Sequence, residues 1–251
     1  MDGSVKRLIA RLRGGRREAV EDDIAVEKRL RVSVNGREVL SLYCTPIMIR
    51  ELVAGLVSTQ GLVEGQWCAD DISILYGEEI TADLTASAAA EVAGATLTSG
   101  CAGGVVFAER QKGIRAGAFS IEAGRLTGLY KAFHGMPGLY RQTGCVHSAG
   151  LSDGKEILCI AEDIGRHNAV DKAIGWALIE GVALGDKIML ASGRLTSEML
   201  SKCARWGMPL LCSRAAPTDM ALKIAGEYEI TVVGFLRGEG MNIYTHPERI
   251  L

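Results

Sequence analysis

A cysteine set among glycines is the first residue in this chain that could carry covalent chemistry. Cys101 lies in the stretch TSGCAGGVVF, with Gly100, Gly103 and Gly104 around it. Glycines let a backbone bend sharply and stay exposed, which suits a thiol on a mobile loop better than one in a packed core. A lone cysteine is more often inert than catalytic, and it becomes reactive only when its thiolate is accessible. Both interpretations stay open for Cys101.

Three polar turns could bind a charged ligand. The turns comprise residues 162–168, 192–194 and 214–218, and each follows a predicted strand. Each turn contributes one arginine: Arg166, Arg194 and Arg214. If the strands are parallel, the turns gather at one edge of the sheet and bring the arginines near helix starts. Arginine side chains and helix N-terminal amides both bind phosphate, so the set predicts a phosphorylated or nucleotide-like ligand.

A purely structural role is the alternative for each of these turns. Thr218 follows Pro217 and could serve only as a helix N-cap. The arginines could pair on a solvated rim with the nearby carboxylates Glu162, Asp163 and Glu198. The structural role is favoured for any single arginine, and ligand binding is favoured for the set.

The four histidines differ in what they suggest. His167 could act as acid or base, contact a base or phosphate, or hydrogen-bond within its turn, and His147 is equally undecided. His134 and His246 are interpreted as peripheral. The spacing H-x-E followed by P-C-x-x-C is missing, so we expect no metal site of the zinc deaminase type. Walker and G-x-G-x-x-G loops are missing as well, which excludes an ordinary ATPase or dinucleotide dehydrogenase by motif.

Composition and charge narrow the class of protein further. A formal charge of −2 over 251 residues gives no argument for binding nucleic acid or a membrane surface, and no apolar run approaches a bilayer span. The seven cysteines form no C-x-x-C pair, and no export signal precedes them, so a reducing cytoplasm is the expected location. Cys159, Cys203 and Cys212 lie in apolar segments and are predicted to be packing residues.

The remaining patterns predict an α/β protein. Alternating apolar residues around the Asn35-Gly36 turn predict a β-hairpin, and Thr45-Pro46 is expected to open a helix. Segment 79–95 is ambiguous between helix and strand. From residue 120 onward, strands alternate with helices at short intervals, which is typical of a layered α/β/α domain with partly parallel strands. We divide the chain into a flexible basic arm (1–19), an α+β region with the Cys101 loop (20–118) and an α/β/α domain (119–251).

Several of these segments together resemble the FdhD/NarQ family of formate dehydrogenase accessory sulfurtransferases. EDIGRHNAVDKAIG at residues 162–175 is the most specific, and the resemblance continues in order from about Ile24 to the C-terminus. The supporting segments are TPIMIRELVAGLVSTQGLV, TGCVHSAGL, SGRLTSEMLSKCARWGMPLL, SRAAPTDMALKIA and GFLRGEGMNIYTHPERI. The resemblance implies a three-layer α/β/α sandwich of the cytidine-deaminase-like type without zinc ligands, and a homodimer.

The function that the resemblance implies is sulfur delivery. Such proteins accept sulfane sulfur from a cysteine desulfurase as a persulfide and pass it to the molybdenum bis(molybdopterin guanine dinucleotide) cofactor of formate dehydrogenase. Cys101 would carry the sulfur, since a persulfide needs an exposed, mobile thiolate. The basic turns, with Arg166, His167, Arg194, Arg214 and Thr218, would bind the cofactor. The family also implies cofactor contacts from the run Phe235, Leu236, Arg237, Gly238, Glu239 and Gly240.

One departure from the family pattern affects the sulfur chemistry. Many members have C-x-x-C in this loop, whereas Gly104 stands at the second cysteine position here. An intraloop disulfide or relay is therefore impossible, and a single-thiol carrier is the simpler hypothesis. Cys145, where a glycine is common in the family, could supply a second thiol. Two other functions remain: a cofactor-binding chaperone whose thiol is incidental, and an enzyme acting on a free nucleobase or nucleotide, which the missing metal ligands argue against.

Overall fold

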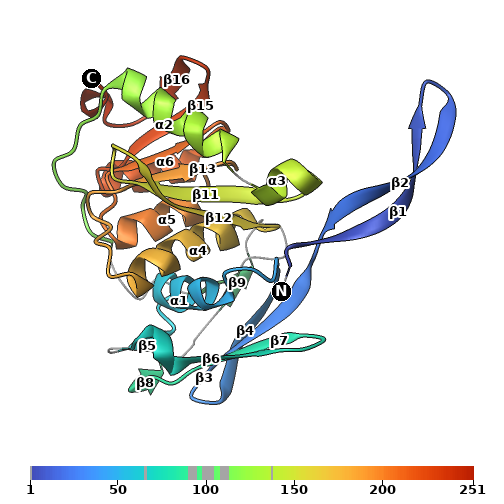
Figure 1. Cartoon of the computed structure of the whole chain (residues 1–251). Helices are drawn as coiled ribbons and strands as arrows, with labels where there is room; N and C mark the ends of the chain where they lie inside the picture. Colours follow the sequence, from blue (N-terminus) through green and yellow to red (C-terminus); the bar gives the residue numbers. More distant parts are fainter. Residues whose placement is uncertain (1, 65–66, 90–94, 98–104, 108–112, 137) are drawn as a thin grey trace.

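The structure is a computed structural model that describes residues 2–64, 67–89, 95–97, 105–107, 113–136 and 138–251. It has a mixed α/β fold with an N-terminal hairpin (Figure 1). Cys101 lies outside the described residues, as does part of segment 79–95. The described parts of that segment are strands, β7 (Ile80–Leu84) and β8 (Ala88–Ala89). Three further short strands are β5 (Val63–Glu64), β9 (Ala95–Leu97) and β10 (Val105–Phe107). The proposed division into domains stays a prediction.

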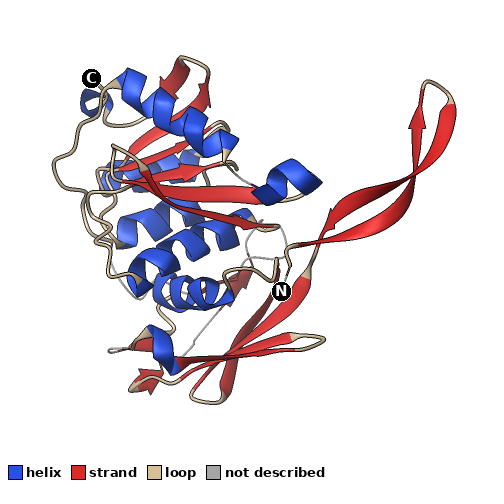
Figure 2. Ribbon diagram, viewed as in Figure 1, coloured by secondary structure: helices blue, strands red, loops and turns tan. Residues whose placement is uncertain are grey.

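The N-terminal segment is a regular hairpin, whereas the sequence predicted a flexible arm over residues 1–19. Strands β1 (Ser4–Arg13) and β2 (Arg16–Ala25) pair in antiparallel register from Ser4↔Ala25 to Arg13↔Arg16. The many arginines suggested a solvated arm, but the two segments pair residue by residue on either side of the Gly14-Gly15 turn, where both glycines have positive φ, 54° and 79°. Figure 2 shows this hairpin extending away from the helices and the other sheets.

The next unit is a four-stranded sheet covered by one helix. Its strand order is β4-β3-β7-β6, with β3 (Lys28–Val34), β4 (Arg37–Cys44) and β6 (Ile72–Tyr76). The predicted turn is confirmed: Asn35 and Gly36 both have positive φ, 52° and 75°, as a type I′ turn requires. Helix α1 (Ile49–Thr59) begins after Met48, later than the predicted start at Thr45-Pro46. Its apolar face and the sheet share one core.

The C-terminal half contains a six-stranded mixed sheet in the order β12-β11-β13-β14-β15-β16. Only the neighbours β13, β14 and β15 are parallel to each other, so the predicted partly parallel pairing is confirmed. The strands are β11 (His147–Ser152), β12 (Ile157–Asp163), β13 (Ile188–Ala191), β14 (Leu210–Ser213), β15 (Thr231–Arg237) and β16 (Gly240–Ile243). The helices are α2 (Ala123–Gly135), α3 (Gly138–Thr143), α4 (Arg166–Ile179), α5 (Ser197–Arg205) and α6 (Asp219–Glu227).

Helices cover both faces of this sheet, which gives three layers (Figure 1). Ile188 and Leu190 of β13 pack with α2, while Met189 and Ala191 pack with α4 and α5 on the other face. Successive residues of a strand point to opposite faces, so a four-residue apolar run serves both cores. Buried Cys159, Cys203 and Cys212 belong to these cores, which confirms their predicted packing role.

The two halves meet where α1 crosses α4. A Cβ placed on Gly55 would lie 1.9 Å from the Asp171 carbonyl oxygen, and one on Gly175 would lie 1.8 Å from that of Glu51. Both separations are far below van der Waals contact, so only glycine allows the two backbones to approach this closely. At this crossing, α4 packs between α1 and the six-stranded sheet. Helix α4 contains most of the motif at residues 162–175.

Candidate functional site

The polar turns lie together at one edge of the six-stranded sheet, as their positions after parallel strands predicted. The turn after β13 is joined to the turn after β14, because Leu195 N donates to Ala216 O at 3.1 Å and Thr218 N to Leu195 O at 3.0 Å. Phe235 N in β15 donates to Ala215 O at 3.2 Å. The carboxyl ends of parallel strands meet at a common edge, which is the usual place for ligands in such sheets.

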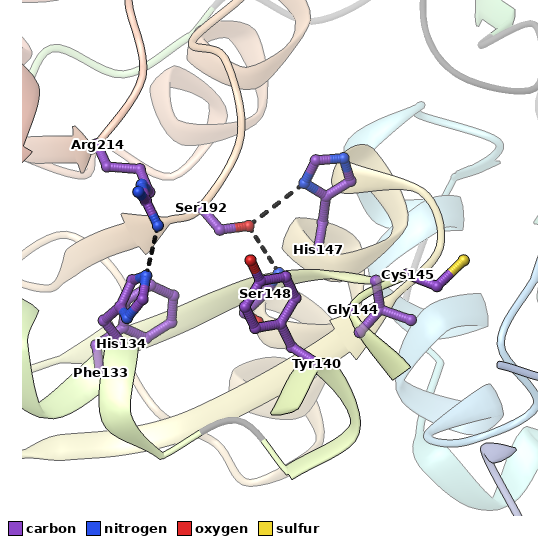
Figure 3. A pocket seen from close by; sticks show the side chains of 10 residues that line it. Phe133, His134, Tyr140, Gly144, Cys145, His147, Ser148, Ser192 and Arg214 are labelled. Carbon is purple, nitrogen blue, oxygen red and sulfur yellow. Dashed lines mark hydrogen bonds between the residues drawn. The ribbon is translucent and has the colours of Figure 1, made fainter. Parts of the chain in front are cut away.

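A cavity of about 360 Å³ opens beside these turns. It is formed by the end of α2, by α3, by the start of β11 and by the turns after β13 and β14 (Figure 3). The polar side chains on its wall are His134, Tyr140, His147, Ser148, Ser192 and Arg214. A concave site with a few convergent polar groups is the usual form of a small-molecule pocket.

One wall of the cavity is organised by Arg214. Its guanidinium donates to Nε2 of His134 at 2.7 Å. Arginine has no acceptor, so Nε2 of His134 is the acceptor in this hydrogen bond. The Arg214 backbone is fixed by the buried Tyr130, whose hydroxyl accepts from Arg214 N at 2.8 Å and donates to Ala191 O at 2.8 Å. Tyr130 thereby ties the ends of β13 and β14 together and sets the position of the guanidinium.

The opposite wall is formed by His147, Ser148 and Ser192. Ser192 Oγ accepts from Ser148 N at 2.9 Å and lies 3.4 Å from Nδ1 of His147. Burial lowers the pKa of His147, and the nearby cations Arg166 and Arg194 lower it further. The ring is therefore neutral at pH 7, and its Nδ1 can accept from the Ser192 hydroxyl. The Ser148 hydroxyl makes no hydrogen bond to any residue that the structure describes, although this residue is only 6% exposed.

Arg166 and His167 lie behind this surface and do not line the cavity. They form the first turn of α4 and are 4% and 9% exposed. Nδ1 of His167 is 3.2 Å from a Glu198 carboxylate oxygen, and its Nε2 is 3.3 Å from Thr196 Oγ1. Burial lowers the pKa of His167 to about 3, and the cations Lys202 and Arg166 act in the same direction. His167 thus has hydrogen-bonding partners, but they lie in α5 and at its N-cap and not in the turn of His167 itself.

A buried ion pair holds the turn that begins α4. Asp163 and Lys172 have fully buried side chains, and Lys172 Nζ lies 2.7 Å from Asp163 Oδ2. The other oxygen of Asp163 accepts from Gly165 N at 2.8 Å and from Asn168 Nδ2 at 2.9 Å. Glu162 is bonded to the amides of α3, so neither acid serves as the rim partner that the structural alternative proposed. The charges of Glu162, Asp163 and Lys172 thus all have partners within the protein. The turn that begins α4 is held by these contacts and does not depend on hydrogen bonds to water.

The C-terminal run predicted to contact a cofactor is divided between surface and core. Phe235, Arg237 and the three residues that follow are exposed, and the Arg237 guanidinium lies 6.0 Å from the centre of the Phe235 ring. Arg237 also donates to Arg214 O at 3.3 Å, which joins this run to the wall of the cavity. Leu236 is 1% exposed and packs in the core under α2, so its side chain cannot reach a ligand. Its interpretation as a contact residue is wrong for the side chain.

Thr218 has the capping role that was the alternative for it. Its hydroxyl accepts from Ala221 N at 3.3 Å and caps α6. The Thr218 side chain is therefore accounted for by helix capping. Arg194 is exposed beside the same edge.

Comparisons with known proteins identify the family of this chain. The model of the FdhD/NarQ family matches residues 25–251. The chain belongs to the FdhD/NarQ family. The relatives named sulfur carrier protein FdhD include those of Geobacillus kaustophilus, 38% identical over 257 residues (98% of this chain, 97% of the relative), and Listeria innocua, 32% identical over 265 residues (100% of both). The crystal structure of a protein assigned as a formate dehydrogenase accessory protein from Desulfotalea psychrophila has a TM-score of 0.78 and 28% identity, covering 100% of both chains.

In this FdhD/NarQ chain, the cysteines that the structure describes fall into two groups. Cys44, Cys159, Cys203 and Cys212 are buried, while Cys68 and Cys145 are exposed. Burial raises the pKa of Cys44, Cys159 and Cys203 to about 12, so these thiols stay protonated. Cys145 lies on the rim of the cavity, and its sulfur points away from the Arg214–His134 pair (Figure 3).

Sequence reasoning missed several residues of the cavity. His134 was interpreted as peripheral and is instead the partner of Arg214, because α2 ends over the turn that follows β14. Ser148 carried no motif signal, and Ser192 was named only as part of the polar turn 192–194, since only the antiparallel pairing of β11 with β13 brings the two together. Among the described residues, no group of three or more His, Cys, Asp or Glu side chains could hold a metal ion. No helix in the described part of the chain is long and apolar enough to cross a membrane.

Proposed function

We propose that this chain is a sulfur carrier for a molybdenum enzyme. It accepts sulfane sulfur from a cysteine desulfurase as a persulfide on Cys101 and transfers it to the molybdenum of bis(molybdopterin guanine dinucleotide), for use by formate dehydrogenase. The curated relatives that carry the name sulfur carrier protein FdhD support this proposal over almost the full chain. In this proposal the molybdenum cofactor is the substrate that the carrier modifies and not a resident group.

The observation that carries the binding half of the proposal is the cavity at the sheet edge. Arg214, His134 and His147 converge there with the hydroxyls of Ser148 and Ser192 around about 360 Å³. A guanidinium suits a phosphate oxygen, and hydroxyls and neutral imidazoles suit the donors and acceptors of a pterin or guanine. The polar lining thus matches one end of a guanine dinucleotide.

The exposed surface next to the cavity extends the proposed site. Arg237 lies beside Arg214 and over the Phe235 ring, and Arg194 is exposed at the same edge. A bis(guanine dinucleotide) is larger than the cavity, so its phosphates and second guanine need such a surface. We assign phosphate contacts to Arg237 and Arg194 and base stacking to Phe235. Arg166 and His167 support the site from behind and do not touch the ligand.

The transfer chemistry is assigned to Cys101. Its thiolate attacks the terminal sulfur of the desulfurase persulfide, so the S–S bond of the donor breaks and its cysteine thiolate leaves. The sequence has glycines on both sides of Cys101 and no second cysteine in the loop, so the sulfur stays on one thiol. The buried cysteines are unsuited to this role because their thiols remain protonated.

A chaperone that binds the cofactor without moving sulfur is the second candidate. It is favoured by one observation: the described residues alone form a cavity of about 360 Å³ with a polar lining. The variant Cys101→Ala separates the two. We expect it to bind GDP like the parent and to leave formate dehydrogenase inactive in cells that lack their own carrier. Full activation of formate dehydrogenase by this variant would support the chaperone function and rule out the sulfur carrier function.

Mass spectrometry tests the persulfide directly. The protein is incubated with a cysteine desulfurase and cysteine, digested without reductant and searched for one added sulfur. We expect the added sulfur on the peptide that contains Cys101, and none in Cys101→Ala. Cys145→Ala serves as the matched control, since Cys145 is an exposed cysteine at the rim of the cavity whose sulfur points away from the Arg214–His134 pair. Added sulfur on Cys145 instead would contradict the single-thiol mechanism.

The setting and assembly follow from the same proposal. A persulfide carrier works in a reducing cytoplasm, where a desulfurase and an apo-formate dehydrogenase are its two protein partners. We also propose a homodimer and a cytidine-deaminase-like type for the three-layer α/β/α sandwich. The layer order supports that fold type, with helices on both faces of a mixed sheet.

A further inference from the structure

The N-terminal hairpin has two unpaired edges. β1 and β2 pair along ten residues each and form a two-stranded sheet of their own within the described structure. Its base lies beside α3, and the rest projects from the molecule (Figures 1 and 2). An isolated two-stranded ribbon is marginally stable in water, and its free edges invite pairing with another chain.

Large apolar side chains are exposed along this ribbon. Leu8 is 76% exposed and Leu12 is 67% exposed, and both lie on the same face with Ala10 between them. On the opposite face, the cross-strand pair Val5 and Ile24 is 38% and 42% exposed. None of these residues belongs to the three buried cores. Such a set of exposed apolar residues on an extended element marks an interaction surface.

The charges of the hairpin are separated along its length. The distal part, residues 9–19, carries four arginines and one glutamate. The basal part, residues 2–8 and 20–27, carries two cations and five carboxylates. The free end is therefore basic and the base is acidic. Two copies of this ribbon arranged antiparallel would place the basic end of each against the acidic base of the other.

We propose that the hairpin is the arm through which two copies of this chain associate. A two-fold axis would relate the two hairpins, so that the face with Leu8 and Leu12 in one copy packs against the face with Leu8 and Leu12 in the other. This contact is isologous, which is what a two-fold dimer requires, and the charge separation selects the antiparallel arrangement. The inference rests on the homodimer proposed above and names the surface that forms it, and its tests do not depend on sulfur transfer.

Sedimentation velocity of the full chain tests the apolar contact. We expect the parent to sediment as a dimer, and the double variant Leu8→Ser, Leu12→Ser to have a dimer dissociation constant raised at least about tenfold. Leu75→Ser is the matched control, because Leu75 is 74% exposed on β6 outside the hairpin. It should dimerise like the parent. A monomeric parent, or a double variant that dimerises as tightly as the parent, would overturn the proposal.

A charge exchange tests the antiparallel arrangement. One variant carries an acidic end (Arg13→Glu, Arg17→Glu) and another carries a basic base (Glu21→Arg, Asp23→Arg). We expect each alone to dimerise weakly, since like charges would face each other, and an equimolar mixture to form a heterodimer in which both contacts are matched. Both variants are expected to fold, because the substituted side chains lie outside the buried cores, and circular dichroism checks this. A mixture that stays as weakly associated as its components would reject the antiparallel contact.

Discussion

The guanidinium of Arg214 and the Nε2 atom of His134 are joined by a hydrogen bond of 2.7 Å at the wall of the cavity. The two residues come from different elements, the turn after β14 and helix α2. The bond fixes the direction of the guanidinium, with Nε2 of the imidazole as the acceptor. The first prediction concerns this pair.

Replacing Arg214 by alanine is expected to weaken GDP binding by about 1–3 kcal/mol, because a charge-assisted contact to phosphate is lost. Isothermal titration calorimetry measures the change. Arg141→Ala is the control, since Arg141 is exposed on the neighbouring helix α3 and donates only to Gly135 O. Equal affinities for the parent and Arg214→Ala would show that the cavity does not bind the nucleotide.

Cysteine alkylation under native conditions should separate the exposed from the buried thiols. At pH 7.5, iodoacetamide is expected to label Cys68 and Cys145 and to leave Cys44, Cys159 and Cys203 unlabelled until urea is added. Burial raises the pKa of the last three to about 12, so access and thiolate formation are both suppressed. Peptide mapping reads out each site. Native labelling of Cys203 would mean that α5 is not packed as described.

Gly175, at the crossing of α1 and α4, should tolerate substitution far less well than a glycine elsewhere in a helix. Gly175→Ala is expected to reduce the free energy of unfolding by more than about 2 kcal/mol, since the new Cβ would lie 1.8 Å from a carbonyl oxygen and the helices must move apart. Gly128→Ala in α2 is the matched control. No atom lies within 4 Å of a Cβ built there, so this change should stabilise the protein by about 0.5–1 kcal/mol. Urea unfolding measures both, and a neutral Gly175→Ala would contradict the crossing.

His167 should make stability depend on pH below neutrality. Its pKa falls from the ordinary 6.5 to about 3 on folding, so the unfolded chain binds more protons between these values. Stability is complete above pH 6.5 and declines as the pH falls through this window. The neighbouring Glu198 carboxylate favours the protonated ring, so we expect a loss of about 1–2 kcal/mol between pH 7 and pH 5. Urea unfolding of the parent and of His167→Gln at both pH values checks this. The loss should be smaller in the variant by about that amount, and identical pH profiles would refute the role of His167.

Much of the C-terminal fold could be predicted from local pattern. The helix from Arg166, the strand pair joined at residues 152–154 and the alternation of strands and helices after it follow from hydrophobic periodicity and from Gly and Pro at the turns. The N-terminal hairpin could not be predicted in this way, because its charged residues outweigh the apolar ones and, among the described residues, most of its length beyond the contact with α3 is exposed.

The sequence by itself determined the family, the order of the elements and the turns that carry arginines, since these depend on residue type and on neighbours a few positions away. Only the tertiary structure decided which of those residues face a ligand. Arg214 lines the cavity together with His134, whereas Arg166, His167 and Leu236 are buried. The reason is physical: a turn brings a side chain to the edge of the sheet, but its exposure depends on what other, distant elements pack against it.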